Sequence, residues 1–180
     1  MNKNSDNING WKSVFANYTI SDVLKDCKYP ICISLFLTII IIINSSDVFV
    51  SLGKIVSGTL SILPDILALL LAGYAIVLTL FWSDYGKNIR KYPSGRQLLK
   101  NINSSYAATI LIMVIVLLFS FVLDIIMDLE IEISDVLSKW INNMTIFIVT
   151  TLLIYSIWLL KDITINIYNL GQTSSFFDND

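Results

Sequence analysis

The residues best suited to chemistry in this sequence are two carboxylates within or beside long apolar runs, Asp65 and Asp124. A charged carboxylate at the centre of a hydrocarbon layer costs about 2.5 to 3.5 kcal/mol on insertion scales, so each of these residues is a candidate functional group. Both fall toward one end of their apolar runs, which lowers this cost. The chemistry that such groups favour is the binding or passage of cations.

Each carboxylate belongs to a stripe of residues with helical spacing. The first stripe has spacings of 11, 4 and 4 and consists of Thr109, Ser120, Asp124 and Asp128. The second has spacings of 3, 4, 3 and 4 and consists of Asp65, Ala68, Ala72, Ala75 and Thr79. Each spacing predicts one face of a helix, and the second face is small and mildly polar.

Two interpretations of these stripes stay open. Small residues let membrane helices approach closely, so Ala68, Ala72 and Ala75 with Gly73 can form a helix-packing seam. Alternatively, several copies surround an axis, with Asp65 or Asp124 in an outer ring and the small face lining a narrow path. The candidate ion-pathway residues of this second interpretation are Asp65, Thr79, Ser120, Asp124 and Asp128.

The elements that must position these residues are membrane helices. Of the 180 residues, 55% are apolar and 14% are charged, and the mean hydropathy is +0.71. A water-soluble domain of this size could not bury so much apolar surface, and a membrane-spanning helix needs about 20 apolar residues. We predict an all-α integral membrane protein with four transmembrane helices that assembles as a homo-oligomer. Its spans lie at about 29–46, 63–82, 106–127 and 144–160, and Pro64 is expected to start the second.

The placement of basic residues predicts the orientation. Ten of the twelve Lys and Arg residues precede span one, lie between spans two and three, or follow span four, and Lys54 and Lys139 lie in the other two loops. Cytoplasmic loops carry such an excess, so we expect both termini in the cytoplasm. The richness in Asn and Ile is typical of an AT-rich bacterial genome, so we expect the protein to lie in the bacterial inner membrane.

The opposite loops are acidic and contain Asp47, Asp128, Glu130, Glu132 and Asp135. They form either a vestibule that concentrates cations or a surface that only avoids positive charge.

The two ends of the chain have patterns of their own. Residues 1–28 form a cytoplasmic amphipathic segment, which carries Trp11, Val14, Phe15 and Tyr18 at helical spacing. We expect Ser21 to cap a short helix there. The segment either lies on the membrane surface or docks a cytosolic protein partner. In residues 161–180, the stripe Ile163, Ile167 and Leu170 predicts that the fourth helix continues to Gly171, before a loose tail.

The loop between spans two and three is a candidate site for an anion. Its basic residues are Lys87, Arg90, Lys91, Arg96 and Lys100. The loop could bind a nucleotide, an oligonucleotide or a lipid head group, with Arg90 and Arg96 as the better phosphate ligands. Membrane orientation alone also explains five basic residues, so this hypothesis stays open.

Motifs of enzymes are absent from the sequence. It contains no HExxH, no GxSxG, no Gly-rich phosphate loop and no histidine. Cys27 and Cys32 are its two cysteines and are expected to be small hydrophobic residues near an interface. We therefore expect no enzyme, no metal and no other cofactor.

Three passages carry a resemblance to a known group of proteins. They are TISDVLKDCKYPI before span one, LAGYAIVLTLF at the end of span two, and the polar loop that runs directly into span three. These passages resemble parts of small bacterial four-helix membrane proteins that act as effectors in anti-phage defence, in CBASS-like or Hailong-like systems. The resemblance implies an oligomeric channel or pore that dissipates the inner-membrane potential upon a cytoplasmic nucleotide-type signal.

Two hypotheses of function follow. The first is an oligomeric, cation-conducting channel that is gated from the cytoplasmic side. The second is a non-conducting anchor or accessory subunit that recruits a cytosolic partner through residues 11–28 or 163–170.

Overall fold

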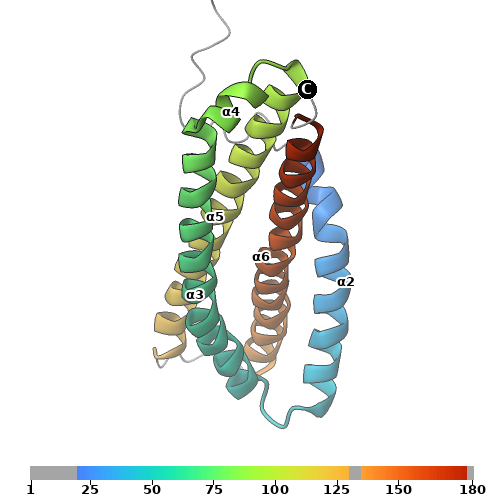
Figure 1. Ribbon diagram of the computed structural model, residues 1–180. Helices are drawn as coiled ribbons and strands as arrows, with labels where there is room; N and C mark the ends of the chain where they lie inside the picture. The colour runs from blue at the N-terminus through green and yellow to red at the C-terminus, as the bar shows by residue number, and fades with distance from the viewer. Residues whose placement is uncertain (1–19, 130–134, 178–180) are drawn as a thin grey trace, which may run out of the picture.

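The computed structural model describes residues 20–129 and 135–177, which are helical apart from short connections and contain no strand (Figure 1). The helices are α2 (Ile20–Asn44), α3 (Val48–Trp82), α4 (Asp84–Ile89), α5 (Pro93–Met127) and α6 (Asp135–Phe177). All except α4 are long and apolar enough to cross a membrane. The structure thus confirms the all-helical class and the four candidate spans.

The four long helices run alternately in opposite directions (Figure 1). The start of α2, the short α4 and the end of α6 lie at one end of the bundle, which we call the basic end. The described basic residues of this end are Lys25, Lys28, Lys87, Arg90, Lys91, Arg96, Lys100 and Lys161. Lys54 and Lys139 lie toward the opposite end, which also carries the connection between α2 and α3.

Helix α6 is the central helix, because it packs against α2, α3 and α5. Helices α3 and α5 pack against each other, whereas α2 lies at the edge and touches α3 only slightly. The larger buried cluster joins α3, α5 and α6 and includes Leu63, Leu70, Ile102 and Met113. A smaller cluster toward the opposite end includes Leu52, Val56, Ile146 and Val149.

Helix α3 begins at Val48, sixteen residues before Pro64, so the prediction that Pro64 starts this helix was wrong. The carboxylate of Asp47 caps the helix by accepting hydrogen bonds from the backbone N–H groups of Phe49 (2.8 Å) and Val50 (3.3 Å). Pro64 lies inside α3. Proline lacks an N–H and its ring crowds the preceding turn, and Figure 1 shows α3 changing direction along its length.

The other helices also extend beyond the predicted spans. Helix α2 already includes Ser21, so the prediction that this residue caps a separate short helix was wrong. Residues 11–18 of the expected amphipathic segment lie outside the described residues. The stretch 93–105, expected to be a polar loop, is the first part of α5. Helix α6 confirms the expected continuation after span four, but the prediction that the helix ends at Gly171 was wrong, because α6 extends to Phe177.

These lengths exceed the thickness of a bilayer. At 1.5 Å per residue, the 43 residues of α6 extend about 64 Å, compared with a hydrocarbon core of about 30 Å. The helices must therefore tilt or project beyond the hydrocarbon. The polar contacts Asn166 Nδ2 to Ser105 Oγ (3.0 Å) and Tyr85 OH to Leu170 O (3.1 Å) hold α6 against α5 and α4 at the basic end.

Candidate ion-pathway face and anion-binding cavity

The second stripe forms a continuous exposed surface on α3, which we call the α3 face. It consists of Asp65, Ala68, Ala72, Ala75 and Thr79. The buried side of α3 includes Leu63, Leu70 and Val77. Each of these precedes a member of the face by two residues, which corresponds to about 200° around a helix. The α3 face therefore points away from the rest of the bundle.

Asp65 is the central residue of α3, whose 35 residues extend from Val48 to Trp82. The helix continues for four turns before Pro64, so Asp65 does not lie near the start of its helix. The Asp65 side chain is exposed, and it makes no hydrogen bond or ion pair with the described residues. An apolar helix thus presents an unpaired carboxylate halfway along its length.

Gly73 lies on a different side of α3 from the other members of the predicted packing seam. A Cβ atom at Gly73 would lie 3.5 Å from the hydroxyl of Tyr106, so this glycine faces α5. The adjacent Tyr74 stacks on Tyr106, with 5.2 Å between ring centroids, and donates a hydrogen bond to Asn103 Oδ1 at 2.6 Å. The α3–α5 contact therefore uses Gly73, whereas Ala68, Ala72 and Ala75 are left exposed.

The first stripe passes from the core to the surface of α5. Thr109 and Ser120 are 2% and 0% exposed, whereas Asp124 and Asp128 are exposed. Each step of four residues exceeds one full helical turn by about 40°, so Ser120 and Asp128, two steps apart, differ by about 80° around the axis of α5. The Ser120 hydroxyl has no hydrogen-bond partner among the described residues. Asp124 lies one turn before Met127, which faces Gly53 near the start of α3, so Asp124 and Asp65 lie at different heights along the bundle.

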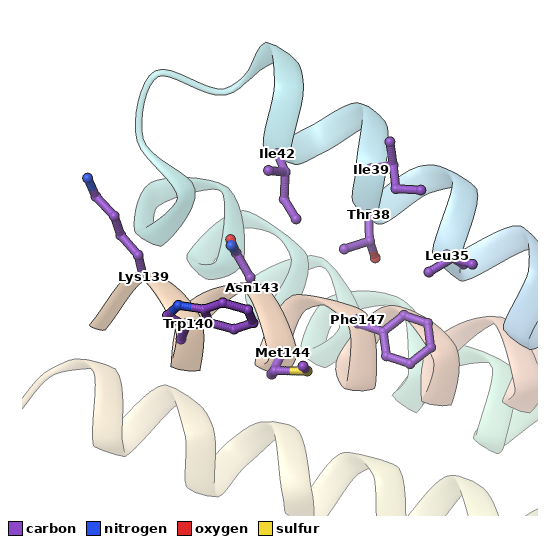
Figure 2. Close-up of a pocket in the computed structure, with 9 residues that line it drawn as sticks. All are labelled: Leu35, Thr38, Ile39, Ile42, Lys139, Trp140, Asn143, Met144 and Phe147. Atoms are coloured by element: carbon purple, nitrogen blue, oxygen red, sulfur yellow. The ribbon is translucent and has the colours of Figure 1, made fainter. Parts of the chain in front are cut away.

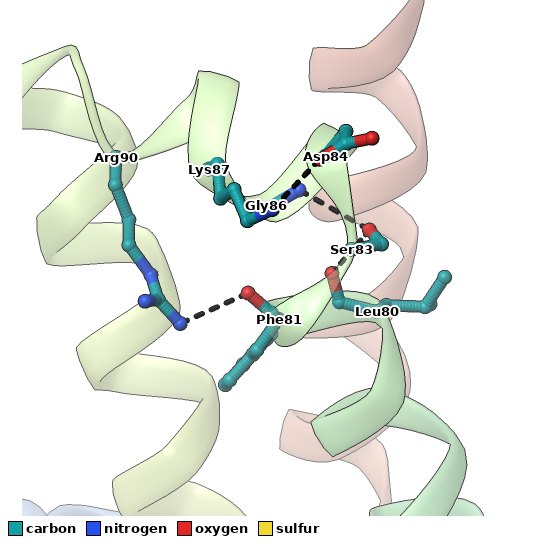
Figure 3. A network of polar contacts seen from close by, with 7 residues as sticks. All are labelled: Leu80, Phe81, Ser83, Asp84, Gly86, Lys87 and Arg90. Atoms are coloured by element: carbon teal, nitrogen blue, oxygen red, sulfur yellow. Dashed lines mark hydrogen bonds and ion pairs between the residues drawn. The ribbon is translucent and has the colours of Figure 1, made fainter.

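The turn around α4 is built by close backbone packing at the basic end (Figure 3). Ser83 Oγ lies 3.3 Å from the backbone nitrogen of Gly86 at the start of α4 and 2.6 Å from the carbonyl oxygen of Leu80. A Cβ atom at Gly86 would overlap the carbonyl of Phe81, and one at Gly95 would overlap the carbonyl of Ile89. These contacts fix the direction in which the chain leaves α3 and enters α5.

Arg90 closes this turn. Its Nη2 donates a hydrogen bond to the carbonyl oxygen of Phe81 at 2.9 Å, and its guanidinium lies 5.6 Å from the ring centroid of Trp82. Lys87 instead pairs with Asp84 at 2.8 Å on the exposed side of α4. The side chains of Lys87 in α4 and of Arg90, which follows the end of α4, therefore point to different surroundings.

A cavity of about 410 Å³ lies beside Arg90, and we call it the basic cavity. It is lined by Leu78, Phe81, Trp82, Arg90, Arg96, Leu99, Lys100 and Asn103. Three of the five predicted anion ligands thus meet at one cavity, together with an indole ring and an amide. Lys87 and Lys91 do not line it, and neither does any acidic residue. This arrangement suits an anion such as a phosphate group.

Sequence reasoning identified the basic residues of this cavity but missed Phe81, Trp82 and Asn103. The spacing of Arg96, Lys100 and Asn103 by four and three residues is a usable signal, because it puts all three on one face of the helix that replaces the predicted loop. No such signal in the sequence indicates that Phe81 and Trp82 of α3 line the cavity, because their position beside α5 depends on the turn around α4.

Within the described ranges, no group of three or more His, Cys, Asp or Glu residues is placed to hold a metal ion, and Cys27 and Cys32 are both free thiols. Comparison of the chain with protein-family models, with curated protein sequences and with solved structures finds no match. The fold itself indicates the class: an all-helical, multi-pass membrane protein.

Proposed function

We propose that several copies of this chain associate through the α3 face and form a path for cations across the bacterial inner membrane. The observation that carries this proposal is Asp65, an exposed and unpaired carboxylate at the centre of an apolar 35-residue helix. Facing lipid, such a group would cost about 2.5 to 3.5 kcal/mol on insertion scales. Facing a water-filled path shared by several copies, it would stay hydrated.

The packing within one chain supports a path between copies. The interior of the bundle is filled by large buried side chains such as Leu63, Met113 and Val116. The α3 face has the opposite character, because Ala68, Ala72 and Ala75 are small and exposed. Small residues allow close approach of helices around an axis, and a ring of Asp65 carboxylates would favour cations over anions.

The basic cavity supports a gating site for an anionic signal on the cytoplasmic side. It is lined by Phe81 and Trp82 at the end of α3, the same helix that carries Asp65. An anion bound between Arg90, Arg96 and Lys100 would change the forces on this end of α3. A nucleotide or an oligonucleotide has the charge and the aromatic rings that these residues and Trp82 accept. Depolarisation of the membrane upon such a signal would suit an effector of anti-phage defence.

The alternative of a non-conducting anchor has less support from the geometry. Its docking stripe on α6 was predicted to include Ile163, Ile167 and Leu170. Ile163 and Leu170 are each 5% exposed and pack in the core, so of the three only Ile167 is available to a partner. Half of its other docking site, residues 11–28, lies outside the described residues.

Conductance of the purified full-length chain in planar bilayers tests the channel. We expect single-channel currents that favour K⁺ over Cl⁻, and Asp65→Asn should lower this permeability ratio at least about threefold, because the ring loses its charge. Asp65→Glu should retain the preference. Asp84→Asn is the matched control, since Asp84 is an exposed acid outside the α3 face. Silent bilayers with folded protein, or an unchanged ratio in Asp65→Asn, would contradict the proposal.

Association through the α3 face has a separate test. Ala72→Phe places a bulky ring on the face, whereas Leu71→Phe enlarges an exposed residue about 100° away on the same helix. Cross-linking in native membranes should detect fewer oligomers of Ala72→Phe and a normal amount of Leu71→Phe. Equal amounts would exclude this face as the interface.

A further inference from the structure

A second cavity lies between α2 and α6, at the end opposite the basic cavity (Figure 2). Its volume is about 420 Å³, and most of its lining is apolar, including Ile39 from α2 and Met144 and Phe147 from α6. Three polar side chains interrupt this lining, those of Thr38, Lys139 and Asn143. Figure 2 shows Thr38 extending from α2 toward α6 and Asn143 extending from α6 toward α2.

The polar atoms of both residues lack partners. Thr38 is 5% exposed, and neither its Oγ1 nor Asn143 Oδ1 has a hydrogen-bond partner among the described residues. This is unusual for Thr38, because a hydroxyl in a helix can bond to a carbonyl one turn earlier. Thr59, Thr151 and Thr164 all do so here, at 2.7 to 2.8 Å. Buried polar groups are normally paired, and of the four unpaired buried atoms among the described residues only these two line this cavity, where a bound molecule can supply their partners.

The apolar cavity adjoins a polar one of about 450 Å³. The two share Ile42, Lys139 and Asn143, and the polar cavity is also lined by Asp47 and Asn142. An apolar chamber thus opens into a polar chamber that holds one cation and one carboxylate. This is the shape and charge of a site for an amphiphile with a zwitterionic head.

We propose that this double cavity binds one phosphatidylethanolamine molecule from the adjacent leaflet. An acyl chain fills the apolar chamber, and the Thr38 hydroxyl donates to an ester carbonyl. The phosphate lies at Lys139. The ammonium supplies the N–H donor that Asn143 Oδ1 needs, and Asp47 balances its charge.

The heights of these residues match the depths of the lipid's groups. Lys139 and Asn143 are four residues apart on α6, about 6 Å along the axis. The contact of Ser34 with Thr151 puts Thr38, one turn later on α2, close to Phe147 and thus about one turn deeper than Asn143. Thr38 is therefore the deepest of the three polar residues, as the ester requires, and the phosphate and the ammonium, which both lie farther out than the ester, meet the two residues nearer the surface.

The N–H groups of the ammonium determine which headgroup the site prefers. Phosphatidylcholine carries the same charges, but its quaternary ammonium has no N–H group and leaves Asn143 Oδ1 unpaired. The proposal therefore predicts that the protein distinguishes two lipids of identical charge and similar chains. This selectivity is independent of conduction through the α3 face.

Native mass spectrometry of the full chain, released from nanodiscs with equal amounts of dioleoyl phosphatidylethanolamine and dioleoyl phosphatidylcholine, tests the site. We expect the retained lipid to favour phosphatidylethanolamine about tenfold. Asn143→Leu should bring this ratio close to one, and Thr38→Val and Lys139→Gln should lower total lipid retention about fivefold. Thr164→Val is the matched control, because its exposed hydroxyl is bonded within α6 and does not line the cavity, and it should keep the wild-type ratio.

Equal retention of the two lipids by the wild-type chain would overturn the proposal, and so would an unchanged ratio in Asn143→Leu. If Asn143→Leu does not fold, Lys139→Gln decides, since Lys139 is exposed at the mouth. Retention that is unaffected by Lys139→Gln, or cross-links that place a second copy over the cavity, would exclude a bound lipid.

Discussion

The hydroxyl oxygens of Ser34 in α2 and Thr151 in α6 lie 2.6 Å apart inside the bundle. Either hydroxyl can donate to the other, and each also lies within hydrogen-bond distance of a carbonyl of its own helix, Ile31 O or Phe147 O. Tyr29 and Trp158 stack on the same interface, with 5.4 Å between centroids. Because α2 packs mainly against α6, these contacts are principal determinants of its position.

Removal of this hydroxyl pair should loosen α2. We expect Ser34→Ala and Thr151→Val each to lower the free energy of unfolding by about 0.6 kcal/mol, the mean for hydrogen bonds between membrane helices. The double variant should lose little more than either single one, because the same interaction is removed. Unfolding in mixed micelles measures all four proteins. Strictly additive losses would mean that the two hydroxyls do not interact.

The α4 turn should tolerate no side chain at Gly86. Gly86→Ala should lower the free energy of unfolding by about 1 to 3 kcal/mol, because the new methyl group overlaps the carbonyl of Phe81. Gly171→Ala is the control, since nothing lies within 4 Å of a Cβ atom there, and helix propensity predicts a gain of up to about 1 kcal/mol. Thermal unfolding in detergent compares the two. Equal stability of both variants would show that the turn rearranges freely.

The basic cavity should bind anions through the residues that line it. We expect Arg96→Gln and Lys100→Gln each to weaken the binding of ATP at least about fivefold, whereas Lys91→Gln, an exposed residue of the same turn, should change it less than about twofold. Equilibrium dialysis with labelled ATP measures this. Binding should also weaken at high salt. An equal effect of all three substitutions would indicate attraction by net charge instead of a defined site.

The alternating helix directions predict opposite exposure for two connections. In a Cys27→Ser, Cys32→Ser background, Lys91→Cys at the basic end and Ser46→Cys between α2 and α3 are both exposed. An impermeant maleimide added to intact cells should label Ser46→Cys and leave Lys91→Cys unlabelled until the cells are opened, as the basic residues predict. Labelling of both from outside would refute the four-span topology.

The sequence by itself determined the helical class, the four candidate spans and the gathering of basic residues at one end. Hydropathy and charge are properties of consecutive residues, so they can be summed along the chain without knowledge of the packing. The same local patterns misjudged Pro64 and residues 93–105, because a proline can lie within a long apolar helix and a polar segment can be helical when neighbouring helices support it.

Only the tertiary structure decided which residues meet across helices and which face outward. It brought Phe81 and Trp82 of α3 to Arg96 of α5, put Asp65 at the centre of an exposed face, and left Thr38 and Asn143 unpaired between α2 and α6. The physical reason is that these relationships depend on the rotation and crossing of packed helices, which are set by the shapes of many distant side chains together. A spacing along one helix defines a face, but only its packed neighbours define what that face meets.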